Sequence, residues 1–417
     1  MTAPDISGFP PSFVEGELRQ ELLQLTSPAI IQLLQDATSE DPVSFALRYH
    51  ARRTELPVRA MTEQLACRQK AQKKLPALCK HNLLYTTEGL EQASGERAAA
   101  YKSTLMHGRH LFDMTGGLGI DTIFLANRFA RSWYSERDPK LAAVMSYNLA
   151  KCGIKSVEVH HGESIRYLES FPDNSFDWIM VDPDRREKQH RTITLQEASP
   201  DVVAIQELLL RKSHNICIKA SPVLETSALK TLLPALHSIL VVSVDHRCRE
   251  LLLLLNRDTA AEHPVTIKAV VLTSPDGLFE ITGETGAERT VTTVQEYLFE
   301  PDPAIIKARL SATLALQFGC SFINESVDYL TGSQDLPSFP GRRFRVNDSF
   351  RYKEKKIRNE IRNRNIRGAS IQRRDFPADV ATMRKKLQLH EDKRNFLFFT
   401  KDASGALICI HAIRELP

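Results

Sequence analysis

Short apolar runs alternate with amphipathic stretches across the middle of the chain. The stretches between them, such as 140–151 and 201–212, carry apolar residues at helical spacing. Strands that alternate with helices at this pace predict a doubly wound, Rossmann-like α/β sheet. The six runs span residues 110–114, 132–136, 157–161, 176–181, 215–220 and 239–244.

A seventh apolar run, residues 250–255, follows the sixth without room for a crossover helix. Two strands joined so tightly must run antiparallel. We therefore expect an antiparallel pair at the edge of the sheet.

The first 100 residues show few strand-like alternations. Leucines and isoleucines between positions 18 and 34 fall mostly at helical spacing, and a second helix is expected over 59–73. Ser27-Pro28 reads as an N-cap followed by proline at the first helical position. This pattern predicts an N-terminal helical domain over residues 1–100 that packs beside or over a functional site.

The pattern changes again after residue 265. Strands are expected over 265–273, 278–282 and 289–293, followed by a helix over 304–316. A link rich in Pro and Gly at 336–341 then leads into a last α+β segment, which closes with a strand at 407–413. We therefore expect a Rossmann-like domain over 101–273 and small α+β domains over 274–336 and 337–417.

Composition places the chain among soluble globular proteins, with 42% hydrophobic and 25% charged residues in 417. The N-terminus lacks the basic region and apolar run of a signal peptide, and the longest apolar runs are too short to cross a bilayer. The seven cysteines never fall at CxxC spacing, so neither a disulfide framework nor a zinc site is indicated. We expect a cytoplasmic protein without a metal and without a membrane partner.

Charge is distributed unevenly along the chain. The segment 342–394, here called the basic block, holds 18 Lys and Arg against 7 Asp and Glu. The total is only +4, so the rest of the chain carries −7. Such a block indicates an anionic partner, or alternatively a merely solvated face.

The stretch Leu111-Phe-Asp-Met-Thr-Gly-Gly-Leu-Gly-Ile-Asp121 carries the most specific chemistry. A strand ends at Asp113, and Gly116, Gly117 and Gly119 allow a cofactor to pass close to the backbone of the following turn. A dinucleotide fingerprint needs a further Gly or Ala where this chain has Thr122. Asp113 also fits a cationic amino-acid head, such as that of S-adenosylmethionine, better than a pyrophosphate.

Two more carboxylates follow the next two expected strands. Glu136 ends the second strand, where it can accept both hydroxyls of a ribose, and Glu163 follows the third, where it can meet an adenine amine beside Ser164. Each acid alone is more often a solvated loop residue. Because the carboxyl ends of parallel strands share one ligand-binding edge, three acids there favour one cofactor site.

These motifs resemble those of class I S-adenosylmethionine-dependent methyltransferases. More narrowly, the chain resembles bacterial methyltransferases with ferredoxin-like and THUMP-like C-terminal domains, over nearly its whole length. The resemblance implies a ferredoxin-like domain over 274–336, a THUMP-like domain over 337–417 and S-adenosylmethionine as the cofactor. It rests on Glu91–Ser94, Asp113–Asp121, Asp182–Arg186, Lys219–Pro222, Tyr297–Ala304 and Arg373–Phe376.

Asp182 and Lys219 are the candidate catalytic residues, because they end the fourth and fifth expected strands. Methyl transfer requires that the acceptor is oriented and its proton removed. A lysine can contact a phosphate or keep Asp182 ionised. Arg185 and Arg186 can grip a phosphate, or else pair with acids on their own loop. The motif Asp182–Arg186 lacks the aromatic of the base-amine methylases, which puts that reaction in doubt.

The basic block is the candidate surface for RNA. Lys355, Lys356, Arg358 and Arg362 are its predicted phosphate contacts, because THUMP domains bind RNA and the spacing 356, 359, 363, 367 places donors on one helix face. Phe344, Phe350, Tyr352 and Phe376 either stack on bases or belong to the core.

Three functions remain open on these residues. The leading hypothesis is a methyltransferase of transfer RNA or ribosomal RNA. The alternatives are a methyltransferase of a small molecule or protein, and a non-catalytic RNA-binding protein that keeps the fold. Cys248 offers a thiolate nucleophile for a pyrimidine carbon mechanism, although cysteines are more often inert.

Overall fold

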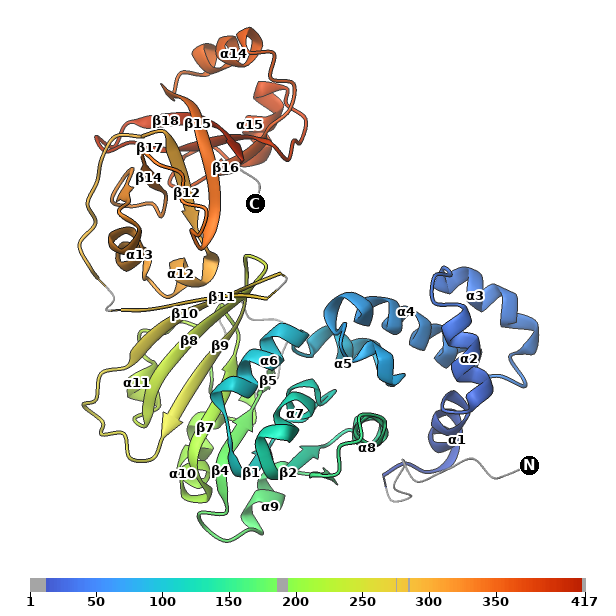
Figure 1. Cartoon of the computed structure of the whole chain (residues 1–417). Helices are drawn as coiled ribbons and strands as arrows, with labels where there is room; N and C mark the ends of the chain where they lie inside the picture. Colours follow the sequence, from blue (N-terminus) through green and yellow to red (C-terminus); the bar gives the residue numbers. More distant parts are fainter. Residues whose placement is uncertain (1–12, 186–193, 275, 284–285, 415–417) are drawn as a thin grey trace. The chain divides into compact units, whose positions relative to one another are not determined.

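A computed structural model describes residues 13–185, 194–274, 276–283 and 286–414 of the chain, with only the backbone of Arg185 (Figure 1). The chain divides into two compact units. One comprises Met1–His237 and Leu252–Pro264, and the other comprises Ser238–Leu251 and Val265–Pro417.

Helices form the N-terminal part of the chain, as the apolar spacing predicts. Ser27 and Asp41 cap the second and third helices, each followed by proline, and the side chains accept hydrogen bonds from Ile30 N and Ser44 N. The elements are α1 (Gly16–Leu25), α2 (Pro28–Asp36), α3 (Pro42–Tyr49), η1 (His50–Arg52), α4 (Val58–Lys74), η2 (Cys79–His81), α5 (Thr87–Gln92) and α6 (Glu96–Leu105).

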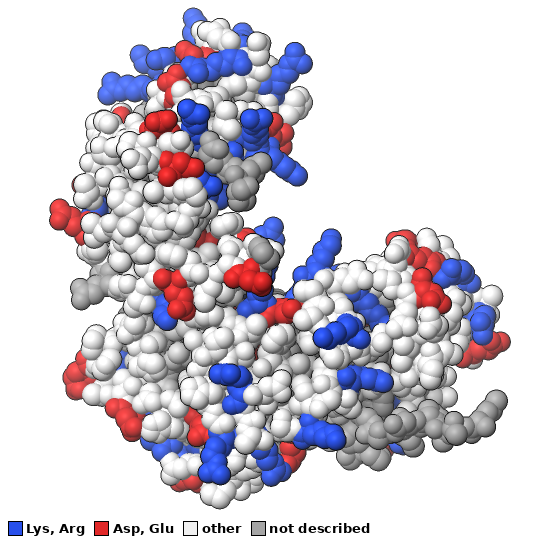
Figure 2. Space-filling model, in the orientation of Figure 1, with Lys and Arg blue, Asp and Glu red and all other residues white. Residues whose placement is uncertain are grey.

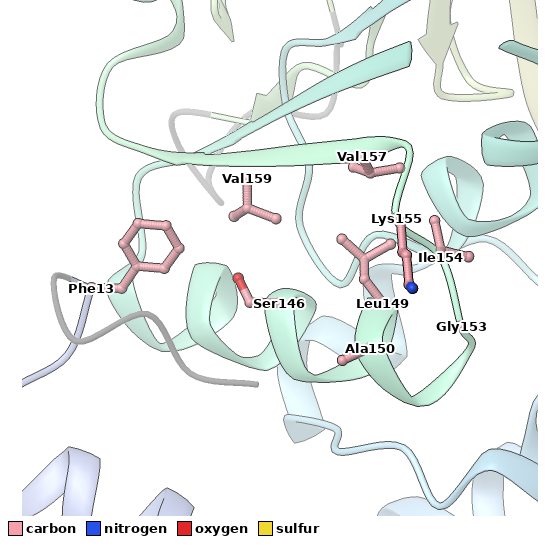
Figure 3. A pocket seen from close by; sticks show the side chains of 9 residues that line it. All are labelled: Phe13, Ser146, Leu149, Ala150, Gly153, Ile154, Lys155, Val157 and Val159. Atoms are coloured by element: carbon pink, nitrogen blue, oxygen red, sulfur yellow. The ribbon is translucent and has the colours of Figure 1, made fainter. Parts of the chain in front are cut away.

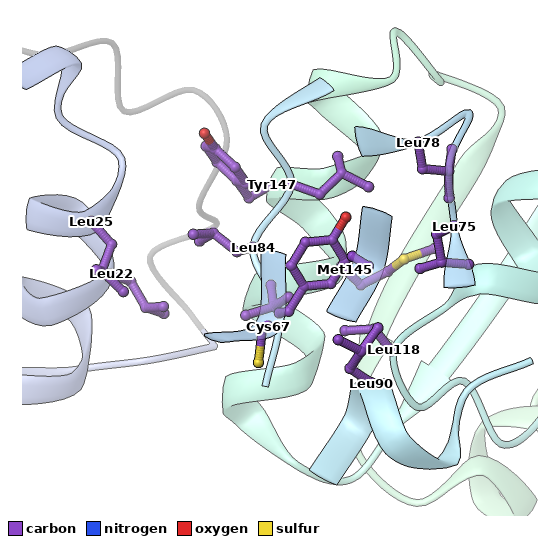
Figure 4. Close-up of a cluster of buried hydrophobic side chains, with 14 of the residues drawn as sticks. Leu22, Leu25, Cys67, Leu75, Leu78, Leu84, Leu90, Leu118, Met145 and Tyr147 are labelled. Carbon is purple, nitrogen blue, oxygen red and sulfur yellow. The ribbon is translucent and has the colours of Figure 1, made fainter. Parts of the chain in front are cut away.

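These helices share one hydrophobic cluster with the Rossmann-like part (Figure 4). Leu22 and Leu65, which are fully buried, belong to the same cluster as Leu118 in the glycine turn and Met145 in α8 (Pro139–Lys151). Burial of apolar surface is the main favourable term in folding. The N-terminal helices therefore stabilise the elements around the glycine turn.

The larger sheet has nine strands in the order β11-β10-β8-β9-β7-β4-β1-β2-β3. The neighbouring pairs β1–β2, β1–β4, β2–β3 and β4–β7 are parallel, and Asp113 lies in register with both Tyr134 and Met180. Strands β1, β2, β3, β4 and β7 therefore end at one edge. The strands are β1 (Gly108–Asp113), β2 (Phe129–Glu136), β3 (Val157–His161), β4 (Phe176–Val181), β7 (Ser213–Ala220), β8 (Leu236–Val244), β9 (Arg247–Asn256), β10 (Thr266–Thr273) and β11 (Gly277–Gly283).

The connections supply the crossover helices of a doubly wound sheet. Asp138 caps α8 and Asp201 caps α10, each through its side chain. The connecting elements are α7 (Ile120–Leu125), η3 (Ala126–Arg128), α8, α9 (Ser164–Glu169), α10 (Val202–Lys212), α11 (Leu229–Leu232) and the short antiparallel pair β5 (Asp184–Arg185) and β6 (Ala198–Ser199).

The predicted place of the antiparallel pair at the sheet edge is wrong. Asp245 and His246 have φ of 48° and 56° and form a tight turn between β8 and β9, as a hairpin requires. However, β9 lies between β7 and β8, and β10 then pairs in parallel with β8 and antiparallel with β11. Strand β11 forms this edge of the sheet, and β3 forms the other.

The second sheet has seven strands in the order β13-β14-β12-β15-β18-β17-β16. Its buried apolar residues include two clusters, one around Phe344 and Phe398 and the other around Ile357 and Phe399. The elements are β12 (Tyr297–Pro301), α12 (Pro303–Lys307), α13 (Ser311–Phe318), β13 (Ser321–Phe322), β14 (Leu330–Gly332), β15 (Gly341–Arg351), α14 (Glu354–Asn363), β16 (Ser370–Arg373), α15 (Val380–Leu387), β17 (Asn395–Lys401) and β18 (Leu407–Arg414).

Three details here differ from the sequence expectations. The segment 274–336 does not form one sheet of its own, because β11 extends the nine-stranded sheet and β12–β14 belong to the seven-stranded one. The helix expected over 304–316 is two helices, separated where Arg309 takes a left-handed φ of 58°. The strand expected over 289–293 is reduced to an isolated bridge between Val291 and Phe322.

Candidate active site

The glycine turn after β1 is packed closely by side chains from β2 and α8. A Cβ at Gly116 would lie 2.1 Å from the ring of Tyr134, so only glycine fits there. Gly119 has a φ of 74°, and a Cβ on it would lie 2.2 Å from Sδ of Met145. The hydroxyl of Tyr134 also donates to Gly117 O at 2.5 Å. Side chains from β2 and α8 therefore fix the conformation of the turn.

Asp113 is buried at the end of β1 and is held by two donors. The hydroxyl of Thr122 donates to its Oδ2, and Thr115 N donates to its Oδ1 at 3.2 Å. Burial raises the pKa of Asp113 to about 7, with smaller contributions from the charges of Asp121 and Asp182 and despite its hydrogen bonds. A cation beside this carboxyl would offset the cost of ionising it.

Glu136 lies at the end of β2 and faces the glycine turn. Its Oε2 accepts from Gly117 N at 2.8 Å, and its Oε1 accepts from Asp138 N at 2.8 Å. Each carboxylate oxygen can accept more than one hydrogen bond, so both can also receive ribose hydroxyls. The two backbone contacts fix the carboxylate in place before any ligand binds.

Glu163 and Ser164 follow β3 at the start of α9. Glu163 is exposed and occupies the N-cap position without a side-chain hydrogen bond to the helix. Ser164 is the first residue of α9 and is partly buried. The contact of Glu163 with an adenine amine stays a prediction.

Asp182 and Lys219 form an ion pair at the ends of β4 and β7. The Lys219 side chain is 11% exposed and that of Asp182 is 40% exposed, so the pair opens to solvent on the side of the aspartate. The backbone N–H of Asp182 donates to Thr115 Oγ1 at 2.5 Å, which ties the end of β4 to the glycine turn. The structure thus brings the two predicted catalytic residues together.

A buried polar group beside the turn was not predicted from the sequence. Lys102 in α6 is fully buried, and its Nζ lies 3.0 Å from Asp121 Oδ1 and donates to Ser94 Oγ at 2.8 Å. Ser94 in turn donates to Asp121 Oδ2 at 2.7 Å. The available signal was the spacing of Lys102, three and four residues after the buried Ala99 and Ala98.

The other predicted substrate contacts fall in two places. Arg186 and the side chain of Arg185 lie outside the described residues. Lys355, Lys356, Arg358 and Arg362 are all exposed on α14, while Ile357 and Ile361 of the same helix are buried. Figure 2 shows Lys and Arg side chains gathered where Figure 1 places α14 and α15.

Two expectations about the basic block need correction. Arg367 does not share a helix face with Lys356, because α14 ends at Asn363. The aromatic side chains are packed inside rather than displayed for base stacking, and all four are buried or partly buried: Phe344, Phe350, Tyr352 and Phe376. Lys356 and Arg364 lie over the ring of Phe350, at 5.8 Å and 5.3 Å from its centroid.

Cys248 does not fit a thiolate nucleophile. Burial raises the pKa of its thiol to about 11, and the nearby carboxylate of Asp302 adds to the effect. The thiolate is the reactive form, so this environment disfavours the pyrimidine carbon mechanism.

A cavity of about 380 Å³ lies elsewhere, between α8 and β3 (Figure 3). Its lining is mostly apolar and contains none of the predicted site residues. Among the described residues, no group of three His, Cys, Asp or Glu side chains is placed to hold a metal. None of the described helices is long and apolar enough to span a membrane.

Comparison with known proteins gives one match to the C-terminal region and others to most of the length of the chain. Residues 341–412 match the family described as THUMP domain-like. Two relatives, both described as uncharacterized S-adenosylmethionine-dependent methyltransferases of Mycobacterium tuberculosis (strains CDC 1551 and H37Rv), are each 22% identical to this chain over 351 residues. The match covers 83% of this chain and 94% of each relative.

A solved structure extends this similarity to nearly the whole fold. The crystal structure of a candidate methyltransferase from Porphyromonas gingivalis W83 matches with a TM-score of 0.77 at 23% identity, over 93% of this chain and 98% of that chain. These matches confirm the predicted fold and the resemblance to methyltransferases with a THUMP-like C-terminal domain. They also support S-adenosylmethionine as the cofactor, while the roles of single residues stay predictions.

Proposed function

We propose that this protein is an S-adenosylmethionine-dependent methyltransferase that acts on RNA, with transfer RNA or ribosomal RNA as the substrate. The observation that carries the proposal is the combination of two features on one chain. An acid-lined glycine turn precedes a THUMP-domain-like region whose α14 exposes Lys355, Lys356, Arg358 and Arg362.

The residues around the glycine turn fit the chemistry of this cofactor. S-adenosylmethionine, when bound, supplies an electrophilic methyl group on a sulfonium. The buried carboxyl of Asp113 matches the cationic amino-acid head, Glu136 is held ready for the ribose, and the backbone at Gly117 has open space beside it. Glu163 is the proposed adenine contact.

Asp182 is the proposed proton acceptor. Its carboxylate lies at the end of β4 and is partly open to solvent, so an acceptor group can reach it. Lys219 pairs with Asp182 and so places a positive charge beside its carboxylate. Asp182 would take up the proton that the acceptor loses on methylation, while the cofactor would supply the methyl group and leave as the neutral thioether. Arg185 and Arg186, in the same motif as Asp182, are the proposed contacts for a phosphate of the RNA.

The basic block supports recognition of RNA through phosphates. The aromatic side chains of this region pack in its core, so stacking on unpaired bases is disfavoured. Exposed Lys and Arg side chains along a helix instead attract phosphates without reading bases. This favours RNA over a small-molecule acceptor.

The test is methyl transfer from radiolabelled cofactor into separated pools of total RNA, total protein and metabolites. Label in the RNA pool is expected, and it should disappear with Asp182→Asn, which serves as the background control. Label confined to protein or metabolites would establish the alternative methyltransferase. Binding of RNA and cofactor without label in any pool would identify a non-catalytic RNA-binding protein.

A further inference from the structure

Thr115, in the glycine turn, contacts both of the acids that lie at the ends of β1 and β4. Its backbone N–H donates to Asp113 Oδ1 at 3.2 Å, and its Oγ1 accepts from Asp182 N at 2.5 Å. The residue is only partly buried. Its hydroxyl therefore lies at the ligand-binding edge of the sheet, next to the predicted cofactor acid and the proposed proton acceptor.

The hydrogen of this hydroxyl is available for donation. A hydroxyl has one hydrogen to donate and two lone pairs that accept. The N–H of Asp182 already occupies a lone pair of Oγ1, so the hydroxyl hydrogen must point elsewhere. Among the residues that the structure describes, no group accepts a hydrogen bond from it. A ligand bound at this edge can therefore supply the acceptor.

The backbone donors of the same stretch are already used inside the protein. The N–H groups of residues 114–117 donate, in chain order, to Met180 O, Asp113 Oδ1, Ser135 O and Glu136 Oε2. The other side chains of this stretch are those of Met and Gly, which have no donor. The Thr115 hydroxyl is thus the donor that residues 114–117 keep for a ligand.

The cofactor brings a group that needs such a donor. The amino-acid head of S-adenosylmethionine carries a carboxylate as well as an ammonium. Asp113 matches the ammonium, but its own negative charge repels a second carboxylate. We infer that the hydroxyl of Thr115 donates a hydrogen bond to the carboxylate of the bound cofactor. This inference rests on the proposed placement of the head beside Asp113.

This role gives the turn a selectivity that the acids do not supply. A ligand that carries only the ammonium satisfies Asp113, whereas a ligand with both groups also engages Thr115. Hydrogen bonds to an ionised acceptor are stronger than those between neutral groups. Donation also polarises the hydroxyl, which makes Oγ1 a better acceptor for the N–H of Asp182. Binding of the head group therefore strengthens the contact that fixes the backbone of Asp182.

Calorimetry with two ligands on the full-length protein tests the inference. S-adenosylmethionine carries the carboxylate, and its decarboxylated analogue lacks the carboxylate but keeps the ammonium. The variant T115V replaces the hydroxyl by a methyl group of similar size, and it also removes the acceptor of Asp182 N. Because that second loss is common to both ligands, the comparison between them cancels it. T115S keeps a hydroxyl and should bind both ligands as the wild type does.

T115V should weaken the binding of S-adenosylmethionine by roughly 10- to 150-fold, the range for loss of a hydrogen bond to a charged group. Its affinity for the decarboxylated analogue should change far less. Equal losses for the two ligands, or no loss for either, would overturn the inference. If T115V does not fold, T115A carries the same comparison.

The matched control is T62V. Thr62 on α4 also has a partly buried hydroxyl that bonds to the backbone, at 2.8 Å from Val58 O, and it should be replaceable without effect on either ligand.

The variant D113N tests the placement of the head in the same titrations. It should weaken both ligands, because both carry the ammonium. Unchanged affinity of D113N for both would overturn that placement and the role of Thr115 with it. None of these titrations involves RNA. Failure of methyl transfer to RNA would therefore contradict the proposed function and leave the result for Thr115 unaffected.

Discussion

The hydroxyl of Thr122, in the first turn of α7, donates a hydrogen bond to the carboxylate of Asp113 at the end of β1. Thr122 stands where a dinucleotide fingerprint has glycine or alanine. Its side chain is fully buried, and its hydroxyl links α7 to β1 by a hydrogen bond. Glycine or alanine at this position would leave only van der Waals contact between the two elements. The departure from the dinucleotide pattern therefore has a structural purpose, which is to hold the acid of the predicted cofactor site.

Cofactor binding should depend on the ionisation of Asp113. Its pKa of about 7 in the free protein means that a cationic ligand meets a partly protonated carboxyl at neutral pH. Affinity for S-adenosylmethionine should therefore rise from about pH 6 to about pH 8, and D113N should lack this rise. The ligand's own amino group titrates near 7.7–8.0. The amino group of the ligand titrates equally with the wild type and with D113N. The difference between the two pH profiles of affinity, measured by calorimetry, therefore gives the contribution of Asp113 alone.

The same carboxyl should impose a pH dependence on stability. Its folded pKa is raised, so between about pH 4 and about pH 7 the folded state keeps a proton that the unfolded state has lost. This term lowers the free energy of unfolding as pH rises, by up to about 1.4 kcal/mol per pH unit. Between about pH 4 and about pH 7, the slope of the free energy of unfolding against pH, measured by urea unfolding without cofactor, should be more positive for D113N than for the wild type. Parallel profiles for the two proteins would contradict the raised pKa.

Removal of the Glu136 carboxylate should weaken cofactor binding strongly. Glu136→Ala loses the acceptor for the ribose and also releases Gly117 N, its partner at 2.8 Å. Loss of hydrogen bonds to a charged group costs about 1.5–3 kcal/mol, or roughly 10- to 150-fold in affinity. Calorimetry with S-adenosylmethionine measures the change, and Glu169→Ala, an exposed acid on α9, is the control. Unchanged affinity in Glu136→Ala would rule out this placement of the ribose.

Asp182→Ala should abolish methyl transfer while leaving cofactor affinity largely intact. The carboxylate of Asp182 belongs to the acceptor side, and its backbone N–H, which contacts Thr115, survives the substitution. Single-turnover transfer to RNA and calorimetry on the same preparation separate the two effects. A variant that turns over at the normal rate would reduce Asp182 to a structural role.

Reversal of charge on α14 should weaken RNA binding and its salt dependence. If about five side chains of the basic block contact phosphates, log affinity should fall with log salt at a slope near −3.5, from roughly −0.7 per contact. Replacing Lys355, Lys356, Arg358 and Arg362 by glutamate should flatten the slope and leave cofactor binding unchanged. Gel shifts with transfer RNA at several salt concentrations measure both quantities.

The control for this reversal is an equal change elsewhere. Four exposed basic residues of the N-terminal helical part serve here, and their replacement by glutamate alters net charge by the same amount: Arg53, Arg59, Lys73 and Lys80. RNA affinity should fall much less in this variant. Equal losses in the two variants, or no RNA binding by the wild type near physiological salt, would exclude α14 as the RNA surface.

The glycine turn and the strands that surround it were predictable because their signals are local. Gly116 and Gly119 stand in one short motif, which can be read without knowing that Tyr134 and Met145 pack against them, and apolar runs mark β3 and β4 to the residue. The position of β9 inside the sheet was not predictable, because it depends on the later pairing of β10 with β8. The sequence alone also leaves open whether Phe344 stacks on bases or packs in a core, since both demand an aromatic in a strand.

The buried lysine escaped prediction for a related reason. Lys102 and Asp121 are distant in sequence, and only the packing of α6 on α7 brings them together. A lysine in a helix is usually exposed to solvent, so the sequence favoured an exposed position for Lys102 over a buried one.

The hydrophobic cluster shared by α1–α6 and the glycine turn has a consequence for how the protein opens. Leu22 and Leu118 belong to one buried cluster, so the N-terminal helices cannot separate without exposing the packing under the turn. Backbone amides of α2 and α4 should therefore exchange with solvent deuterium in the same cooperative event as those of α7. A ligand held only at the glycine turn would then slow exchange in helices that it never touches.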